Sequence, residues 1–355
     1  MQSKHFQNAF STSENDKIDK LIQDAQQNVN NDLQVIEWIP YDRFKDVKQI
    51  GKGGFGTIHY ARWVDGYIEK WDIENQQWKR YQDEGEVEVA LKKLKNVYII
   101  IFTDEFDSIR FYGIIQDPET LKYMMVLEYA KDGNLREYLK NNYNNINWKQ
   151  KLENLHSLSS SFKDYIQISG FGLSKLIGAN PNNPERKNIV GVLPYISPEV
   201  LSGDEYTKAA EVYSFGIIAY ELITGFPPYP DIPHDEDLAI KICNGLRPKI
   251  SFHTPKLITT IMRCWDARVT HRPTFNELQV ELWKYSNQES TNTTTTTAPL
   301  NYQTYPLEIY TSRLLNYSKL PKPKNEENFE RELEELTKSF SHITSNDDID
   351  EFQIL

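Results

Sequence analysis

The sequence predicts an α+β protein in which strands dominate the first part of the chain and helices dominate the second. From residue 44 onward, and again over residues 123–127, the residue pattern is that of strands. Residues 211–224, EVYSFGIIAYELIT, are apolar on nearly every face, which indicates a helix buried all round. At about 14 residues it is too short to span a bilayer, which needs about 20. We therefore expect it to form the centre of a soluble helical core.

The composition indicates a soluble protein of a reducing, cytoplasmic compartment. The 355 residues include 40 Lys and Arg against 51 Asp and Glu, a net charge of −11. This charge gives no general attraction to nucleic acid or to an anionic membrane. Two cysteines form no disulfide framework, and residues 1–10 contain no apolar signal region. The length predicts one large domain with tails.

Three blocks in the second half of the chain carry the most specific signal. They are residues 191–199 (GVLPYISPE), the apolar helix at 211–224, and residues 264–274 (CWDARVTHRPT). In this order and spacing they resemble the C-lobe of a eukaryotic protein kinase, most closely the tyrosine-kinase-like branch, whose members mostly phosphorylate serine and threonine. The resemblance implies a bilobal fold with a small, mainly-β N-lobe and a larger, mainly-α C-lobe. It also implies an ion pair between Glu199 and Arg272 across the buried helix.

The resemblance divides the chain into four parts. Residues 1–40 are a polar N-terminal extension, and residues 41–131 correspond to the N-lobe and the hinge that follows it. Residues 132–285 correspond to the C-lobe. Residues 286–355 form a Thr- and Asn-rich linker and an acidic tail, and the linker composition cannot build a core.

Both ends of the chain contain apolar residues at helical spacing. In the extension this pattern predicts one amphipathic helix that docks on the domain, with a disordered leader as the alternative. In the tail, an isolated acidic helix is marginal in water, so we expect a solvated tail that limited proteolysis removes, or a helix that packs on a partner. The apolar positions are Ile18, Leu21, Ile22, Ala25 and Val29 in the extension, and Phe329, Leu333, Leu336 and Phe340 in the tail.

The N-lobe part contains the elements that the family uses to bind ATP. Residues 50–58, IGKGGFGTI, fit the glycine-rich pattern G-x-G-x-x-G-x-V, in which glycines let the backbone approach phosphates closely. Rossmann folds share this pattern, but here a strand, not a helix, follows it. Residues 89–92, VALK, match the family's strand that places a lysine at the α and β phosphates. By resemblance, the nucleotide-binding residues are Gly51, Gly53, Gly54, Gly56, Ile58, Ala90, Lys92, and the hinge residues Glu128 and Ala130, with Leu127 as gatekeeper.

Residues 64–88 alternate aromatic and polar positions around a polar turn near 74–77. We expect an extended hairpin here, longer than the usual connection in the family. In contrast, residues 96–108 are too few for the family's next helix at about 1.5 Å per residue. That helix carries the glutamate partner of the lysine. Glu105 is a candidate substitute for it, and a solvated capping carboxylate is the alternative.

A second gap follows the helix that Asn147 caps, which we expect to end near residue 162. Residues 159–163 contain no His, Arg, Asp or Asn, so the catalytic loop H-R-D-x-x-x-x-N of the family has no counterpart. A predicted strand at 164–169 then leads to Gly170, which stands where the D-F-G motif has its metal-binding aspartate. The chain therefore lacks the residues that accept the substrate proton and hold the metal.

These losses predict no catalytic residue, no metal site, and at most weak ATP binding without magnesium. A positioned general base alone is worth about 10² to 10⁴ in rate, so we expect no useful phosphoryl transfer from the chain as written. Glu211 replaces the aspartate that bonds the catalytic loop in the family. Residues 175–194, the activation segment, contain no Ser, Thr or Tyr that phosphorylation could switch.

Three functions remain open at this stage. The first is a pseudokinase that acts in signalling as a scaffold for an unknown protein partner, with ATP but neither nucleic acid nor membrane as a ligand. The second is an active serine/threonine kinase, if the two internal gaps arise from splicing or from the gene model. The third is a non-functional truncated product. Gly170 lies outside both gaps, so restoring them leaves the metal-binding aspartate absent, which favours the first.

Overall fold

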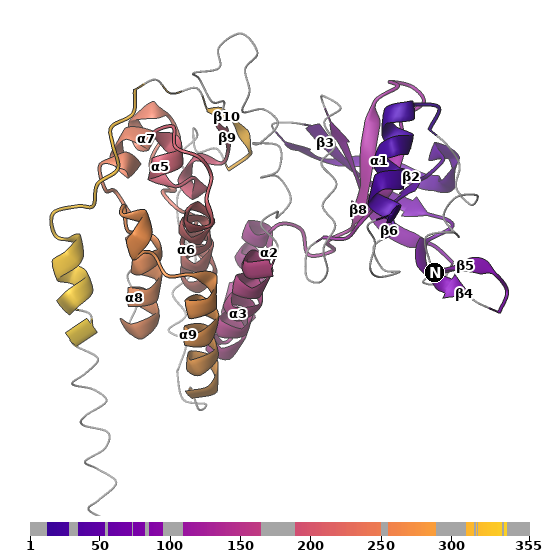
Figure 1. The fold of residues 1–355 in the computed structure, drawn as a ribbon. Helices are drawn as coiled ribbons and strands as arrows, with labels where there is room; N and C mark the ends of the chain where they lie inside the picture. Colours follow the sequence, from indigo (N-terminus) through magenta and orange to yellow (C-terminus); the bar gives the residue numbers. More distant parts are fainter. Residues whose placement is uncertain are drawn as a thin grey trace, which may run out of the picture. The chain divides into compact units, whose positions relative to one another are not determined.

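The computed structural model describes residues 13–27, 35–53, 56–72, 74–81, 85–94, 109–164, 189–249, 255–288, 310–315, 317, 319–335 and 337–338. The chain divides into two compact units, Met1–Lys131 and Asp132–Leu355. The first is built mainly of strands and the second mainly of helices (Figure 1). The expected combination of a mainly-β N-lobe and a mainly-α C-lobe is therefore confirmed.

The N-lobe is built on a six-stranded sheet with the order β1-β7-β8-β6-β3-β2. Neighbouring strands are antiparallel, except that β1 and β7 are parallel. The strand predicted at 123–127 corresponds to β8. The bounds are β1 Glu37–Trp38, β2 Phe44–Gly53, β3 Gly56–Trp63, β6 Val87–Leu94, β7 Phe111–Gln116 and β8 Tyr123–Glu128.

The extended hairpin predicted at 64–88 is present as β4 (Tyr67–Asp72) and β5 (Gln77–Tyr81). Tyr67 stacks on both Tyr81 and Tyr112, with ring centroids 5.0 Å apart in each pair. The Arg110 guanidinium lies 4.0 Å from the centroid of the Tyr67 ring. The hairpin thus adds to the apolar core on one face of the sheet. This core includes Phe44, Trp63, Val89, Leu91, Tyr112, Ile115, Met124 and Val126.

Helix α1 (Asp16–Gln27) packs against the opposite face of the sheet, at the β7 side (Figure 1). Ile18 and Ile22 form an apolar cluster with Ile36 and Ile114, and all four side chains are at most 5% exposed. The buried Gln26 side chain donates to the Ile36 carbonyl at 2.7 Å. The predicted docking of an amphipathic helix is confirmed. The side chains of Leu21 and Ala25, and residue Val29, lie outside the described part.

The segment after α1 adds the edge strand β1, which the sequence analysis did not anticipate. Glu37 of β1 lies opposite Gly113 of β7. A Cβ at Gly113 would lie 2.1 Å from the Glu37 carbonyl oxygen, so only glycine permits this approach. The buried Glu37 carboxylate accepts two hydrogen bonds from Arg80 of β5, at 2.6 and 2.9 Å. This bidentate pair joins the N-terminal extension to the hairpin.

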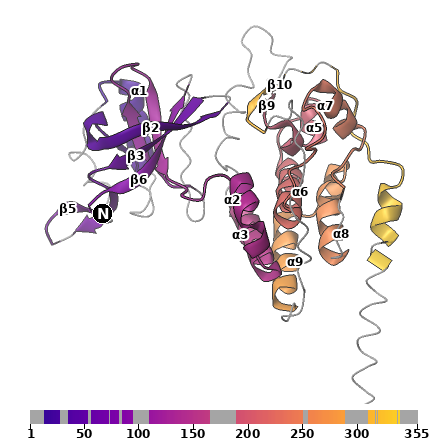
Figure 2. The same ribbon diagram turned by 180° about the vertical axis from the view of Figure 1, so that it is seen from behind.

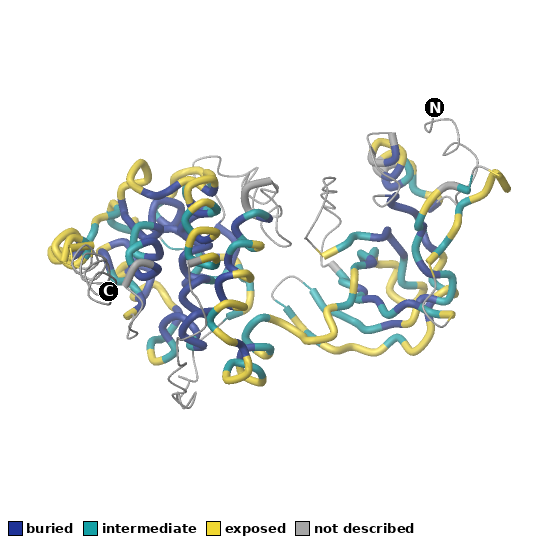
Figure 3. Tube along the Cα trace, turned by 90° about the horizontal axis from the view of Figure 1, so that it is seen from below, coloured by how far each residue is buried: buried dark blue, intermediate teal, exposed yellow. Residues whose placement is uncertain are grey.

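The predicted buried helix is α6 (Lys208–Thr224), which begins three residues earlier than expected. The Thr207 side chain caps it by accepting from the Ala210 amide at 3.2 Å, and Gly225, with φ 73°, ends it in the left-handed conformation. Buried residues concentrate in the interior of this unit (Figure 3). Within the described residues, every helix falls short of the length and apolarity that crossing a membrane requires.

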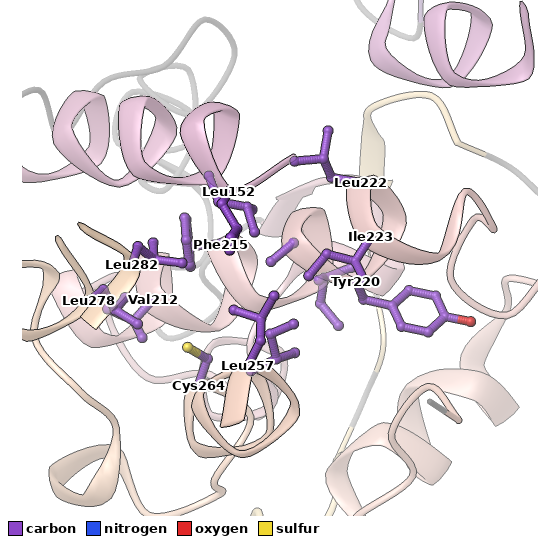
Figure 4. Packing of buried hydrophobic residues seen from close by; sticks show 14 of the residues in the cluster. Leu152, Val212, Phe215, Tyr220, Leu222, Ile223, Leu257, Cys264, Leu278 and Leu282 are labelled. Carbon is purple, nitrogen blue, oxygen red and sulfur yellow. The ribbon is translucent and has the colours of Figure 1, made fainter. Parts of the chain in front are cut away.

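Three further helices surround α6 (Figures 2 and 4). They are α3 (Trp148–Asp164), α8 (Pro255–Cys264) and α9 (Phe275–Gln288). Their side chains Leu152, Leu257, Leu278 and Leu282 meet Val212 and Phe215 of α6 in one cluster. The described part of the C-lobe also contains α2 Leu135–Asn142, α5 Pro198–Leu201 and α7 Glu236–Cys243.

Asn147 caps α3 as predicted. Its side chain accepts from the Gln150 amide at 2.8 Å, while Gln150 accepts from the Asn147 amide at 2.9 Å. The helix continues to Asp164, so the strand expected to start there is wrong at that residue. The rest of that expected strand, the D-F-G position at Gly170 and most of the activation segment lie outside the described residues.

Part of the tail packs on the C-lobe, which was not expected, whereas residues 330–335 are exposed apart from the half-buried Leu333. Strand β10 (Arg313–Leu315) pairs antiparallel with β9 (Ile189–Gly191). Leu315 is 3% exposed and Phe329 is 6% exposed. Residues 329–335 are helical, as the spacing in this part of the tail indicates, and β10 lies before them, where the sequence shows no such period. Of the tail residues with helical spacing, Leu336 and Phe340 lie outside the described part.

The predicted ion pair between Glu199 and Arg272 is confirmed. The guanidinium donates to the two carboxylate oxygens at 2.6 and 2.7 Å, and both residues are buried. Arg272 also donates to the carbonyls of Asp266 and Ala209, each at 2.8 Å. One side chain thus joins α5, the first turn of α6 and the loop before α9.

Replacing Arg272 by methionine is expected to lower the free energy of unfolding by about 3–5 kcal/mol, because it leaves the Glu199 carboxylate buried without its partner. Denaturant unfolding at neutral pH measures this change. Arg331→Met is the matched control, since both side chains of the Arg331–Glu335 pair are exposed, at 66% and 68%, and an exposed pair is worth about 0–1 kcal/mol. Equal costs for the two substitutions would contradict the central role of the buried pair.

Candidate nucleotide-binding site

The strand pairing brings several predicted nucleotide-binding residues onto one face of the N-lobe sheet. Ile58 lies opposite Lys92, which lies opposite Met125, and Ala90 lies opposite Leu127. Directly opposed residues of antiparallel strands point to the same face. Ile58, Ala90 and Lys92 therefore share a face with the gatekeeper position, on the side of the sheet away from the aromatic core.

Helix α1 covers the far end of the same face. Ile114 of β7 lies opposite Met125, so a row of paired residues runs from Ile58 through Lys92 and Met125 to Ile114. The α1 side chains pack on Ile114. The N-terminal extension therefore shields the β7 end of the face that carries Lys92.

The glycine-rich segment forms the hairpin between β2 and β3. Gly51 pairs with Ile58, and Gly53 pairs with Gly56. A Cβ at Gly51 would come no closer than 3.8 Å to its neighbours, and one at Gly53 no closer than 3.9 Å. These are ordinary contact distances, so the packing of the chain itself does not require glycine at either position. Gly54 lies outside the described residues.

Lys92 is a half-buried cation, and its burial lowers the pKa of the ammonium group. Among the residues that the structure describes, no carboxylate forms an ion pair with it. Lys93 instead points to the opposite face and pairs with Asp117. The candidate partner Glu105 lies outside the described residues. Lys92, and not Lys93, is therefore the lysine of β6 whose charge is available to an anionic ligand.

The hinge follows directly after β8. The Glu128 amide donates to the Arg110 carbonyl at 2.8 Å, so this donor is already used. Ala130 is exposed, and its backbone makes no hydrogen bond to another residue in the described part of the chain. Tyr129 contacts Tyr60 of β3 edge-to-face, with ring centroids 5.1 Å apart. The hinge therefore presents a free backbone donor and acceptor at Ala130.

Within the C-lobe, Glu211 lies on the first turn of α6. Its Oε2 atom is buried and has no hydrogen-bond partner among the described residues. Burial raises the pKa of this carboxyl to about 7, and the nearby Lys208 lowers it in part. Nowhere in the described ranges do three His, Cys, Asp or Glu side chains gather as metal ligands.

The C-lobe contains a second cluster of charged groups, which was not predicted from the sequence. Glu221 of α6 is 3% exposed and forms an ion pair with Arg136 of α2 at 3.2 Å. Tyr195 donates its hydroxyl proton to Glu221 and accepts from Arg136 at 3.0 Å. Burial raises the pKa of both Glu221 and Tyr195. A glutamate inside an otherwise apolar helix was the sequence signal for this cluster.

A family model described as protein tyrosine and serine/threonine kinase matches residues 44–163 and 158–282. The chain belongs to this kinase family. The two matched pieces meet at residues 158–163, near the end of α3. They extend from the first residue of β2 into α9.

Curated relatives of this kinase-family chain carry kinase names. It is 25% identical over 292 residues to the probable serine/threonine-protein kinase roco5 of Dictyostelium discoideum, covering 73% of this chain and 10% of that protein. It is 25% identical over 272 residues to the tyrosine-protein kinase SPK-1 of Girardia tigrina, covering 66% and 52%. It is 27% identical over 277 residues to the serine/threonine-protein kinase VIK of Arabidopsis thaliana, covering 68% and 60%. The chain thus spans less than two thirds of each of these relatives.

Glu211 predicts a pH-dependent stability of this kinase-family chain. Its pKa is raised from 4.5 to about 7 on folding, so between these values the folded chain binds more protons than the unfolded chain, and stability falls as pH rises. The contribution is complete below about 4.5 and is lost as pH rises through about 7. We expect Glu211→Gln to raise the melting temperature at pH 8 and to change it less at pH 5.

Glu236→Gln is the control for this measurement, because Glu236 is an exposed acid in the first turn of α7. It should shift the melting temperature little at either pH. If Glu211→Gln shifts the melting temperature equally at pH 5 and pH 8, a partner stabilises the ionised Glu211 carboxylate in the folded chain, and the prediction is wrong.

Proposed function

We propose that this chain is a pseudokinase that acts in signalling as a binding module, and that it binds ATP weakly without transferring its phosphate. The observation that carries the proposal is Gly170, which stands where the family has its metal-binding aspartate. Phosphoryl transfer depends on metal ions, on positioning and on an acceptor for the hydroxyl proton. A glycine offers no ligand, and the sequence contains no H-R-D loop to supply the acceptor.

The position of the second gap supports this proposal. The family match breaks into two pieces at residues 158–163, where the catalytic loop has no counterpart in the sequence. In the structure α3 continues through these residues to Asp164. The residues at which the chain of a family member leaves this helix and begins the catalytic loop are therefore still helical here.

The surviving N-lobe elements support nucleotide binding. Lys92 lies beside Ile58 and shares a face with Ala90, its charge is not neutralised by a described carboxylate, and the Ala130 backbone is free. The glycines of the β2–β3 hairpin leave room for a ligand to approach the backbone. We propose that ATP binds here with an affinity that magnesium does not improve, because no metal ligand holds the ion against the phosphates.

A cytoplasmic setting belongs to the same proposal. Its support is the pair of free, buried cysteines, Cys243 and Cys264, which pack into the C-lobe core as small apolar residues.

The second candidate is an active serine/threonine protein kinase, of which this chain is a shortened form. The observation that favours it is that the family match resumes directly after the break at 158–163, as it would if a segment had been removed. The longer form of the chain would then carry a catalytic loop, and Gly170 would be the one remaining departure from the metal-binding residues of the family.

The purified chain is expected to show no magnesium-dependent phosphorylation of itself or of a generic protein substrate, because it has neither the metal aspartate nor the proton acceptor. Transfer from radiolabelled ATP, with the Lys92→Met variant assayed in parallel, measures this. Turnover that Lys92→Met abolishes would overturn the proposed pseudokinase function in favour of the second candidate.

Binding of a fluorescent ATP analogue is expected to be equal with magnesium and with a chelator, and about tenfold weaker in Lys92→Met. A hydrogen bond to a charged group is worth about 1.5–3 kcal/mol, and 1.4 kcal/mol is tenfold in affinity. Lys93→Met is the matched control, because Lys93 lies on the other face of the same strand. A similar loss in both variants would place the nucleotide elsewhere.

A further inference from the structure

Helix α9 packs on the rest of the C-lobe with one side and presents the opposite side to solvent. Its Leu278 side chain lies in the core around α6. On one flank of the helix, Glu281 accepts a hydrogen bond from Arg263 of α8 at 3.0 Å. On the other flank, Gln279 donates to Ser160 of α3 at 2.6 Å. The face between these flanks consists of exposed residues, at positions 276, 277, 280, 283, 284 and 287.

Two neighbouring apolar side chains lie on this exposed face. Val280 is 53% exposed and Trp283 is 58% exposed. They are three residues apart on the helix, so their side chains are neighbours. Within the described part of the chain, the Trp283 indole makes no ring contact and no hydrogen bond. Tryptophan is enriched in protein interfaces, where it often supplies much of the binding energy. The pair therefore marks a candidate interaction surface.

Two opposite charges border the apolar pair along one edge of the face. Glu277 and Lys284 are seven residues apart, which is about two turns or 10 Å along the helix. Neither side chain forms an ion pair with another described residue. Glu277 accepts from the Thr274 amide and hydroxyl through its Oε2 atom alone. These hydrogen bonds lower the pKa of Glu277, so the carboxylate is charged at neutral pH and its Oε1 atom is available to a cation.

The order of these residues makes the face complementary to an inverted copy of itself. Val280 lies close to the midpoint between Glu277 and Lys284. If two α9 helices pair antiparallel with their Val280 side chains in contact, each Glu277 lies opposite the Lys284 of the other copy. Such a contact uses the same patch on both copies, as a two-fold axis requires. A parallel pair would instead place like charges opposite each other.

We propose that the exposed face of α9, defined by Glu277, Val280, Trp283 and Lys284, binds a second copy of this chain in an antiparallel, two-fold symmetric dimer. Self-complementarity of charge selects this occupant, because an unrelated partner gives no reason for the two ends of the face to match each other. The inference goes beyond the proposed function, since the contact requires neither a nucleotide nor phosphate transfer.

The size of the face sets the strength of the dimer. One helix from each copy makes a small interface, and small interfaces belong to weak or transient complexes. We therefore expect a dissociation constant of about 10–100 µM. Trp283 provides the largest apolar area on this face, so its loss should weaken the dimer most.

Sedimentation equilibrium of the full-length chain measures this association, over about 5 to 500 µM so that the expected dissociation constant is bracketed. We expect a monomer–dimer equilibrium in which Trp283→Ala raises the dissociation constant at least tenfold. Leu121→Ala is the matched control, because Leu121 is 68% exposed in the turn between β7 and β8. This control variant should dimerise like the wild-type chain.

A pair of charge reversals tests the antiparallel register. Lys284→Glu places two carboxylates opposite each other at both ends of the contact, and Glu277→Lys places two ammonium groups there. Each variant alone should dimerise at least tenfold more weakly than the wild-type chain, because like charges across an interface repel. An equimolar mixture of the two variants should regain dimerisation, since every pair across the contact again has opposite charges.

Three results would overturn the inference. They are a full-length chain that stays monomeric at every concentration, equal dimerisation of Trp283→Ala and Leu121→Ala, and a mixture of folded charge variants that stays monomeric. Thermal unfolding shows whether each variant is folded. The samples contain no nucleotide, so failure of the dimer leaves the proposed pseudokinase function standing.

Glu277→Lys also removes the hydrogen bonds to Thr274, so a second measurement covers the case in which this variant does not fold. Salt screens exposed charges, with a Debye length of about 3 Å at 1 M. Raising the salt concentration should weaken the wild-type dimer and strengthen the Lys284→Glu dimer. A salt effect of the same sign in both chains would contradict the proposed pairing.

Discussion

The buried pair of Glu199 and Arg272 organises the C-lobe. Four hydrogen bonds from one guanidinium fix the carboxylate of α5, the carbonyl of Ala209 near the start of α6, and the carbonyl of Asp266 in the loop before α9. Because both charges are desolvated, each depends on the other to remain where it is. The segment between β9 and α5 leads directly into this pair. Strand β9, which pairs with β10 of the tail, is therefore positioned by an interaction that contains no tail residue.

The parts of the fold that the sequence predicted are those with long patterns. The mostly apolar stretch that became α6, the capped start of α3 and the hairpin at 64–88 each extend over enough residues for the sequence pattern to show their environment. Strands β1 and β10 have two and three residues, too few to show a period. Each also pairs with a strand far along the chain, so no local signal marked them.

The candidate nucleotide-binding site was likewise predicted from the sequence only in part. That Ile58, Ala90 and Lys92 share a face follows from the two-residue period of strands once their pairing is known. What covers that face depends on tertiary packing, and no motif predicted that α1 would pack on Ile114. The Arg136 cluster was missed for a related reason, since its ring partner Tyr310 lies in a segment whose composition suggested only a linker or tail. Periodicity identifies which residues need partners, but it does not identify the partners.

The two flanks of the chain bear on where the folded domain ends. The family match covers residues 44–282, yet α1 and β1 precede it and β10 follows it. Each flank buries apolar side chains on the lobe next to it, with Ile18 at 3% exposure at one end and Leu315 at 3% at the other. A recombinant fragment cut at the family limits would uncover Ile114 and the Leu315 cluster together. Its poor solubility would then reflect where it was cut, not any instability of the kinase fold.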